Sequence, residues 1–311
     1  MKFKDKNKDK NENENKNKDI NNRVSVAPTA KHAYYRTTSA IDQGAKIQFR
    51  IGFALLAIPL VLFLINLFYR PYDTSSMNMT ERFMSPDLNH WFGTDNYGRD
   101  IFTRVMSGLP LTIIISIGIN LIGCLSGLLI GGLSGYFGGI VDYWGNRISD
   151  ALLSIPAILM GMLFVASFGE GIRQVIVALG IMFIPSYMRV VRSGFLEYRQ
   201  RNFVKRLQLL GASSARIIWL HLFPQIRTRL MSAIALGFAN AILAESSLSF
   251  LGLGVPLSQI TWGKMLKDAQ GFIFQAPWSA IAPGMMIVTL VLGSFFISNG
   301  LKQLAQQRSL A

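Results

Sequence analysis

Long apolar runs alternate with charged segments along most of this chain. A helix of about 20 apolar residues, rising about 1.5 Å per residue, crosses a hydrocarbon core of about 30 Å. Six runs approach that length, so the pattern predicts an all-α membrane protein with six transmembrane helices. The predicted spans are Ile51–Tyr69, Leu111–Ile130, Leu152–Phe168, Ile172–Val191, Leu230–Leu253 and Trp278–Leu301.

The segment before the first span has a different composition. Apart from Phe3, residues 2–19 are Lys, Asn, Asp and Glu in near alternation, and such a composition cannot bury a core. We therefore expect residues 1–50 to form a disordered basic cytoplasmic tail. The tail either touches anionic lipid or is a solvated extension with no special role, and the composition favours the second.

The remaining polar segments divide the chain further. Residues 51–69 form the first predicted transmembrane helix, and residues 70–108 form an extracytoplasmic loop. The end of that loop, residues 98–108, has an apolar face at helical spacing and predicts a short helix at the membrane interface. Residues 109–303 then hold five predicted transmembrane helices.

The distribution of charge matters more than its total. The formal net charge is +14, which would be compatible with nucleic-acid binding. The positive charge, however, lies in the N-terminal tail and in residues 192–229, which carry eight basic residues and one acid, Glu197. Both segments flank apolar spans, so we expect a lipid membrane partner, no nucleic acid, and cytoplasmic positions for this loop and both chain ends. The single cysteine, Cys124, lies in an apolar span and allows neither an internal disulfide nor a cysteine metal site.

The loop at residues 192–229 contains a basic amphipathic segment from Glu197 to Pro224. Apolar residues at helical spacing predict a first helix, and Gly211–Ser213 supplies a turn and an N-cap. A second, more apolar helix should follow over residues 215–223 and end at Pro224. Spacing alone leaves two interpretations open: a rigid knob moved by a soluble motor, or a basic loop that only fixes topology.

Four residues of this segment, Phe203, Gly211, His221 and Pro224, belong to a pattern that resembles the coupling loop of ABC-transporter permeases. That family has Glu-Ala-Ala, three residues, Gly, nine residues and Ile-x-Leu-Pro, and the Gly and Pro match in type and spacing. The subset that imports di- and oligopeptides or nickel commonly has His at the Ile position, as here.

Further motifs, in chain order, resemble the C-type permease subunit of the same subset. Residues 90–100 are similar to its His-x-x-Gly-Thr-Asp-x-x-Gly-Arg-Asp signature, and residues 245–254 to its motif in the fifth span. Residues 262–266 and 282–284 resemble the segments that follow. Together the matches run from about residue 90 to 300 in order, so the resemblance is specific.

The resemblance implies the type I importer permease fold in a bacterial cell membrane. It also implies three kinds of partner: a second permease chain in a heterodimer, two ATP-binding cassette ATPases, and an extracytoplasmic substrate-binding protein. The chain has no Gly-x4-Gly-Lys-Ser/Thr loop, so we expect a non-catalytic subunit without a cofactor of its own, with ATP and magnesium bound by the ATPases. The substrates implied are peptides, nickel or metal chelates. The coupling residues implied are Phe203, Lys205, Arg206, Leu207, Gly211, Ala212, Ser213, His221 and Pro224.

One departure from the pattern favours an alternative function. The Glu-Ala-Ala positions are occupied here by Lys205-Arg206-Leu207, which reverses the charge of the family's acid. This favours a non-transporting or weakly coupled membrane component that kept the permease fold. A secondary transporter is disfavoured, because such proteins usually carry more intramembrane charges than a single Glu245.

Two polar clusters are further candidates. Glu245 and Ser249 lie in the fifth span and are candidates for the translocation path, although Glu245 could instead bond a neighbouring serine or a backbone group. The extracytoplasmic segment could form a metal or phosphate site with His90, but carboxylates that alternate with Arg usually pair. We therefore favour an internally paired structural elbow. Its residues are Gly93, Asp95, Gly98, Arg99 and Asp100.

Overall fold

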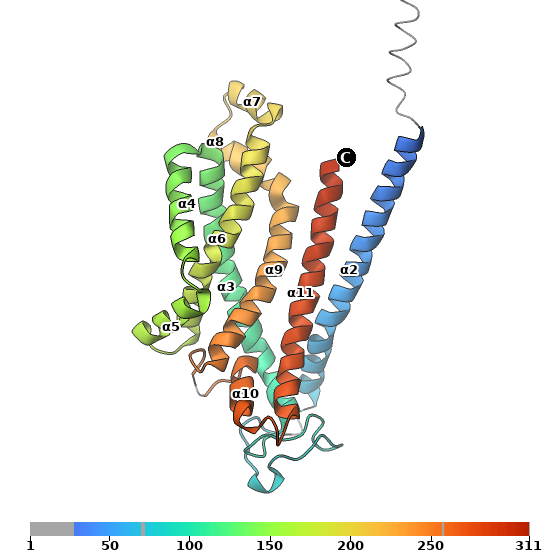
Figure 1. Ribbon diagram of the computed structural model, residues 1–311, viewed down its shortest axis with the longest axis vertical. Coiled ribbons are helices and arrows are strands. Elements are labelled where there is room, and N and C mark those ends of the chain that lie inside the picture. Colours follow the sequence, from blue (N-terminus) through green and yellow to red (C-terminus); the bar gives the residue numbers. More distant parts are fainter. Residues whose placement is uncertain (1–27, 70–71, 257, 311) are drawn as a thin grey trace, which may run out of the picture.

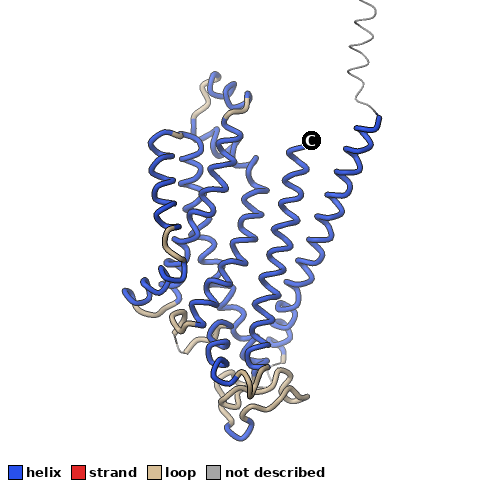
Figure 2. The backbone as a smooth tube through the Cα atoms, in the orientation of Figure 1, coloured by secondary structure: helices blue, strands red, loops and turns tan. Residues whose placement is uncertain are grey.

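The computed structural model describes the backbone of residues 28–69, 72–256 and 258–310. This part of the chain is almost entirely helical (Figure 2). Five of its helices are long and apolar enough to cross a membrane, and one bent helix pair can supply a sixth span. The expected all-α membrane fold is therefore confirmed.

The elements follow one another with short connections, except on either side of η1 and before α10. They are α2 (Pro28–Phe68), η1 (Met79–Glu81), α3 (Ile101–Phe137), α4 (Gly139–Leu153), α5 (Ala157–Phe168), α6 (Ile172–Arg199), α7 (Asn202–Leu209), α8 (Ser214–Arg216), the π-helical η2 (Ile217–Leu222), α9 (Phe223–Phe250), α10 (Trp262–Ala269), η3 (Gln270–Phe272) and α11 (Trp278–Leu310).

The two ends of the bundle differ in character. Figure 1 shows α7, α8, the start of α2 and the end of α11 at one end, and α10 with the connection between α2 and α3 at the other. The chain passes along the bundle through α2, α3, the α4–α5 pair, α6, α9 and α11 in turn. Both ends of the described chain therefore lie on the same side as α7.

Two predictions about the polar segments are corrected. The disorder expected for residues 1–50 is wrong for residues 28–50, because α2 begins at Pro28 and continues into the first span without a break. Tertiary packing stabilises this extension: a Cβ atom added to Gly300 on α11 would lie 3.2 Å from the Phe49 ring and 3.3 Å from the Ala45 carbonyl oxygen. Residues 1–27 lie outside the described residues.

The separate interfacial helix expected over residues 98–108 is also wrong. Asp100 caps α3, since its carboxylate accepts a hydrogen bond from the Thr103 N–H at 2.7 Å, and the helix then runs from Ile101 to Phe137. The apolar face that suggested an interface is instead buried in protein, with Val105 0% exposed and Met106 1% exposed.

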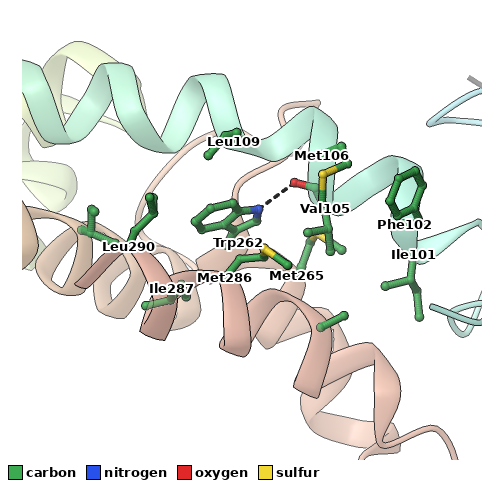
Figure 3. Close-up of a cluster of buried hydrophobic side chains, with 12 residues drawn as sticks. Ile101, Phe102, Val105, Met106, Leu109, Trp262, Met265, Met286, Ile287 and Leu290 are labelled. Atoms are coloured by element: carbon green, nitrogen blue, oxygen red, sulfur yellow. Dashed lines mark hydrogen bonds between the residues drawn. The ribbon is translucent and has the colours of Figure 1, made fainter. Parts of the chain in front are cut away.

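Trp262 on α10 occupies the centre of that buried cluster. Figure 3 shows its indole lying between α3 and α11, with the N–H directed at the Val105 carbonyl oxygen, which it meets at 2.7 Å. The tryptophan is fully buried, so its one polar group is satisfied by a carbonyl inside a helix. This contact joins α10 to the first turns of α3.

The third predicted span, Leu152–Phe168, is not a single helix. Its first residues end α4, and α5 starts at Ala157 after a bend of 82°. Pro156 lies at the bend, where it has no N–H to continue the helix and disfavours helical geometry in the residue before it. The charged residues Asp142, Arg147 and Asp150, which precede this predicted span, lie on α4.

The close packing of α3 against α6 is built on a stripe of glycines. Four glycines recur at every fourth position of α3 and so share one face. An added Cβ would lie 2.5 Å from the Tyr187 Cβ at one of them, and 2.5 Å from the Met188 carbonyl oxygen at another. The two backbones therefore approach as closely as small residues permit in membrane bundles. The four glycines are Gly123, Gly127, Gly131 and Gly135.

This packing predicts opposite effects for one substitution at two helical glycines. Gly131→Ala places a methyl group 2.5 Å from a backbone oxygen of α6, so we expect a lower thermal unfolding midpoint in detergent. Gly284→Ala on α11 would meet no atom closer than 3.9 Å, and should leave the midpoint unchanged or raise it, because Ala favours helix by about 1 kcal/mol. Equal midpoints for the two variants would contradict the close packing.

Candidate functional site

The segment from Asn202 to Leu222, here called the knob, lies at the end of the bundle where α6 ends and projects beyond the end of α3 (Figure 1). Its first helix, α7, ends at Gly211, whose φ of 77° lies in the left-handed region that glycine adopts without strain. The Gly211 N–H donates to the Gln208 carbonyl, and the Ala212 N–H donates to the Leu207 carbonyl, both at 3.0 Å. These two bonds form a Schellman motif, which closes the helix in one defined geometry.

The second half of the knob begins with the expected cap. The Ser213 hydroxyl accepts a hydrogen bond from the Arg216 N–H at 3.4 Å. The helical run from Ser214 then continues through Leu222 into α9, up to Phe250, as one element. The knob is therefore joined directly to a membrane-crossing helix.

Pro224 does not end this helix, contrary to the prediction. Ile217–Leu222 is a π-helical turn, in which the Phe223 N–H donates to the Ile218 carbonyl five residues back. Pro224 then takes a first-turn position of α9, where a missing N–H is tolerated. The wider turn lets the proline sit inside a continuous helical run.

The base of the knob is a buried apolar cluster. Val204, Ile217 and Leu222 are all 0% exposed. They pack in one cluster with Tyr136 at the end of α3 and Phe195 on α6. Such a fully packed base holds the knob rigidly on three helices.

The crest of the knob, by contrast, exposes large apolar side chains. Leu209 is 87% exposed, Leu210 82%, Leu220 64% and Trp219 51%. Around them Lys205, Arg206 and Arg216 are exposed as well. Large apolar side chains beside cations at a protruding tip are typical of a surface that binds another protein.

The sequence analysis found part of this surface and missed part. Lys205, Arg206, Gly211 and Ser213 are exposed as a coupling role requires, whereas Leu207, Ala212 and His221 are half-buried. Leu209, Leu210, Trp219 and Leu220 were not predicted as site residues. Their signal was available, since large apolar residues beside cations in a loop cannot all face the chain's own core.

Ion pairs fix the helices that carry the knob. Glu197 on α6 pairs with Arg229 on α9 at 2.6 Å, and more loosely with Arg201 at 3.9 Å. Asp142 on α4 accepts a hydrogen bond from the Arg192 guanidinium on α6 at 2.6 Å. The acid Glu197 therefore serves an internal contact rather than the crest.

The elbow at residues 93–100 is paired within the chain. The Asp95 carboxylate accepts hydrogen bonds from the Tyr97 N–H at 2.8 Å and from the Arg99 side chain at 2.7 Å. Asp268 on α10 lies 3.7 Å from Arg104 and 3.9 Å from Arg99. Two Asp and two Arg thus form a balanced network between this elbow, α3 and α10.

The remaining residues of the elbow are engaged as well. The imidazole of His90 lies 3.0 Å from the Asp100 carboxylate, which also caps α3. Gly98 passes so close to the Asn78 backbone that an added Cβ would lie 1.8 Å from its carbonyl oxygen. Gly93 has a φ of 71°. Within the described ranges, no group of three His, Cys, Asp or Glu side chains could hold a metal ion.

Glu245 lies inside the subunit rather than on an open wall. The side chain is fully buried, and its carboxylate accepts hydrogen bonds from Ser249 at 2.8 Å and Ser246 at 3.3 Å. Gly263 of α10 packs on the same turn, since an added Cβ would meet the Ser246 carbonyl oxygen at 2.4 Å. A role of Glu245 or Ser249 in translocation stays a prediction.

These features define a class of protein: the transmembrane subunit of an ABC transporter. The bundle resembles a solved structure of the inward-facing methionine ABC transporter MetNI with a TM-score of 0.53, over 67% of this chain and 96% of that chain. The sequence identity of that match is 17%, so it supports the fold alone.

The sequence comparisons identify the family. Residues 127–308 match the family described as binding-protein-dependent transport system inner membrane component. The dipeptide transport system permease protein DppC of Alkalihalophilus pseudofirmus is 35% identical over 244 residues, which cover 77% of this chain and 80% of that protein. The nickel transport system permease protein NikC of Escherichia coli K12 is 31% identical over 253 residues, covering 81% and 91%. The chain therefore belongs to the family of inner membrane components of binding-protein-dependent transport systems, and is a non-catalytic permease subunit.

The network at the elbow predicts a strong dependence on Asp95. Asp95→Asn leaves Arg99 without its nearest charge partner and leaves Arg104 with Asp268 alone, and breaking a buried pair costs about 3–5 kcal/mol. We expect a large fall in the thermal unfolding midpoint of the purified protein. The control is Asp150→Asn, which breaks an exposed pair with Arg189 worth about 0–1 kcal/mol. Similar midpoints for the two variants would show that the network does not stabilise the elbow.

Proposed function

We propose that this chain is one half of the translocation path of an ATP-driven importer, and that it imports peptides or nickel, free or chelated. Support comes from its relatives. Besides the dipeptide and nickel permeases, the oligopeptide transport system permease protein OppC of Bacillus subtilis is 30% identical over 252 residues, which cover 81% of this chain and 83% of that protein. These names span both substrate classes.

The proposed assembly holds a second permease chain in a heterodimer, two ATPase subunits that bind ATP and magnesium, and an extracytoplasmic substrate-binding protein. This chain contributes no cofactor site to it. The basic knob and both chain ends face the cytoplasm, which the concentration of Lys and Arg in residues 192–229 supports. The elbow and α10 then face the binding protein.

The observation that carries the coupling role is the contrast between the crest and the base of the knob. The base is buried against α3 and α6, and the crest exposes Leu209 and Leu210 almost completely. A partner that grips the crest therefore moves α9 and α6 together rather than bending a loop. ATP-driven closure of the ATPases would rock these helices between inward- and outward-open states.

The alternative of a non-transporting component rests on the cations at positions 205 and 206. Both side chains are exposed on α7, so the reversed charge at position 205 and the added charge at position 206 change the surface offered to a partner without disturbing the fold. The relatives are transport permeases, so the family evidence does not favour this alternative. We infer that the ATPase of this system presents a complementary, acidic groove.

Truncating the crest should uncouple transport without unfolding the chain. Leu210→Ser removes an exposed apolar side chain, and loss of a central interface contact typically weakens binding by about 2 kcal/mol, or about 30-fold. We expect ATPase stimulation by the loaded binding protein to fall strongly in proteoliposomes. Less ATPase should also co-purify with Leu210→Ser. The control is Phe274→Ser, which alters a fully exposed side chain at the opposite end of the bundle and should leave the amount of co-purified ATPase unchanged. Normal stimulation in Leu210→Ser would remove the crest from the coupling mechanism.

Reversing the charge at position 205 distinguishes a coupled importer subunit from a weakly coupled membrane component. Lys205→Glu restores the family's acid at an exposed site. If the ATPase groove is acidic, less ATPase should co-purify with the variant. This loss should be smaller at high ionic strength, because salt screens the repulsion between like charges. Lys205→Gln is the control for loss of charge alone. Improved ATPase stimulation in Lys205→Glu would instead support a weakly coupled component.

A further inference from the structure

A groove at mid-membrane depth separates two helices that both lead to the knob. It encloses about 440 Å³ between α5, α6 and α9. On α6 its lining includes Ser186 and Tyr187, and on α9 it includes Gly237 and Asn240. Ser186 is in the middle of α6, and Asn240 is ten residues before the end of α9, so the groove lies well inside the membrane.

Two polar side chains in this groove are exposed. Ser186 and Asn240 are both classed with the exposed residues, and neither side chain forms a hydrogen bond with another of the residues that the structure describes. The hydroxyl of Tyr187 is different, because it donates to the Asn120 side chain and contacts the Ala233 carbonyl at 3.4 Å. The side chains of Ser186 and Asn240 therefore have no hydrogen-bond partner among the described residues, whereas the Tyr187 hydroxyl beside them has one.

A lipid-facing position does not suit these groups. Polar groups at membrane depth face the bundle interior or a water-filled cavity, because hydrocarbon offers them no partner. A second groove of the same size, between α2, α3, α9 and α11, shows the contrast. Its exposed residues are apolar, with Ile117 52% and Leu121 54% exposed, as expected of a surface that meets acyl chains.

The side chains that line the first groove limit the class of ligand that it can bind. Besides Tyr187, its lining holds no ionisable side chain, and its free groups are one amide and one hydroxyl. An amide both donates and accepts hydrogen bonds, which suits the C=O and N–H groups of a peptide backbone. A bare divalent nickel ion prefers imidazole, thiolate or carboxylate ligands, and none lines this groove.

We propose that Ser186 and Asn240 form a water-accessible wall of the translocation path that takes the amide backbone of a peptide. This inference rests on the proposed importer function and refines its substrate class. The wall also lies on the coupling elements: α9 continues from the knob, and Asn240 is about 35 Å from Ile217 along it. Motion of the knob is therefore transmitted along α9 to this wall of the path.

The test uses single cysteines in the assembled complex in membrane vesicles, with Cys124→Ala as the background. Asn240→Cys should react with a hydrophilic, membrane-impermeant thiol reagent at least ten times faster than Leu121→Cys, the control in the apolar groove. An excess of a di- and tripeptide mixture, with the binding protein and ATP, should slow the labelling at position 240 at least threefold. Nickel chloride should not.

Each other outcome contradicts the inference. Labelling at position 240 as slow as at position 121 would mean that a partner helix or lipid covers the groove. Protection by nickel chloride alone would assign a metal substrate, and protection by neither would remove the groove from the path. Failure of the proposed function itself is recognised separately, because the Cys124→Ala complex would then show no ATP-driven uptake of either substrate.

Discussion

The buried apolar cluster beneath the knob is the contact on which the rest of this structure depends. Val204, Ile217 and Leu222 are inaccessible to solvent and pack with residues of α3, α6 and α9. A close-packed cluster of this kind transmits displacement rather than absorbing it. Because the π-helical turn and Pro224 keep the knob continuous with α9, force applied at the crest reaches the middle of the membrane along one helix. Because the glycine stripe packs α3 closely against α6, these two helices move as one body.

The end of the bundle opposite the knob is stabilised by ion pairs and hydrogen bonds rather than by an apolar cluster alone. There, backbone that is not helical is held by a balanced set of Asp and Arg side chains and by two tryptophan N–H groups, one bonded to the Val105 carbonyl and one to the Thr94 carbonyl. Such an elbow resists deformation. The reversed charge at Lys205 and the added charge at Arg206 affect neither end internally, because both side chains are exposed. They change the surface that the knob offers to a partner.

Much of this architecture could be predicted from sequence, because apolar length and charge asymmetry report directly on the bilayer. The spans at α2, α3, α6, α9 and α11, and the Gly211 turn, followed from those patterns. The missed features depend on tertiary contacts that periodicity does not record. Residues 44–49 of α2 pack on α11, and the face around Val105 is apolar because Trp262 covers it. Proline alone did not predict where a helix ends: Pro156 marks a bend, whereas Pro224 lies inside a continuous helical run. The crest residues were missed because family motifs mark the knob's turn and not its contact surface.

The central claim is that the knob docks an ATPase, and purification of the complex from its own membranes tests it most directly. The full chain and a variant that lacks residues 205–215 would be isolated in mild detergent, and their partners identified by mass. The account predicts an ATPase and a second six-span chain with the full chain, and the second chain without the ATPase for the variant. Recovery of the ATPase by the variant, or its absence from the full chain's complex, would contradict the account.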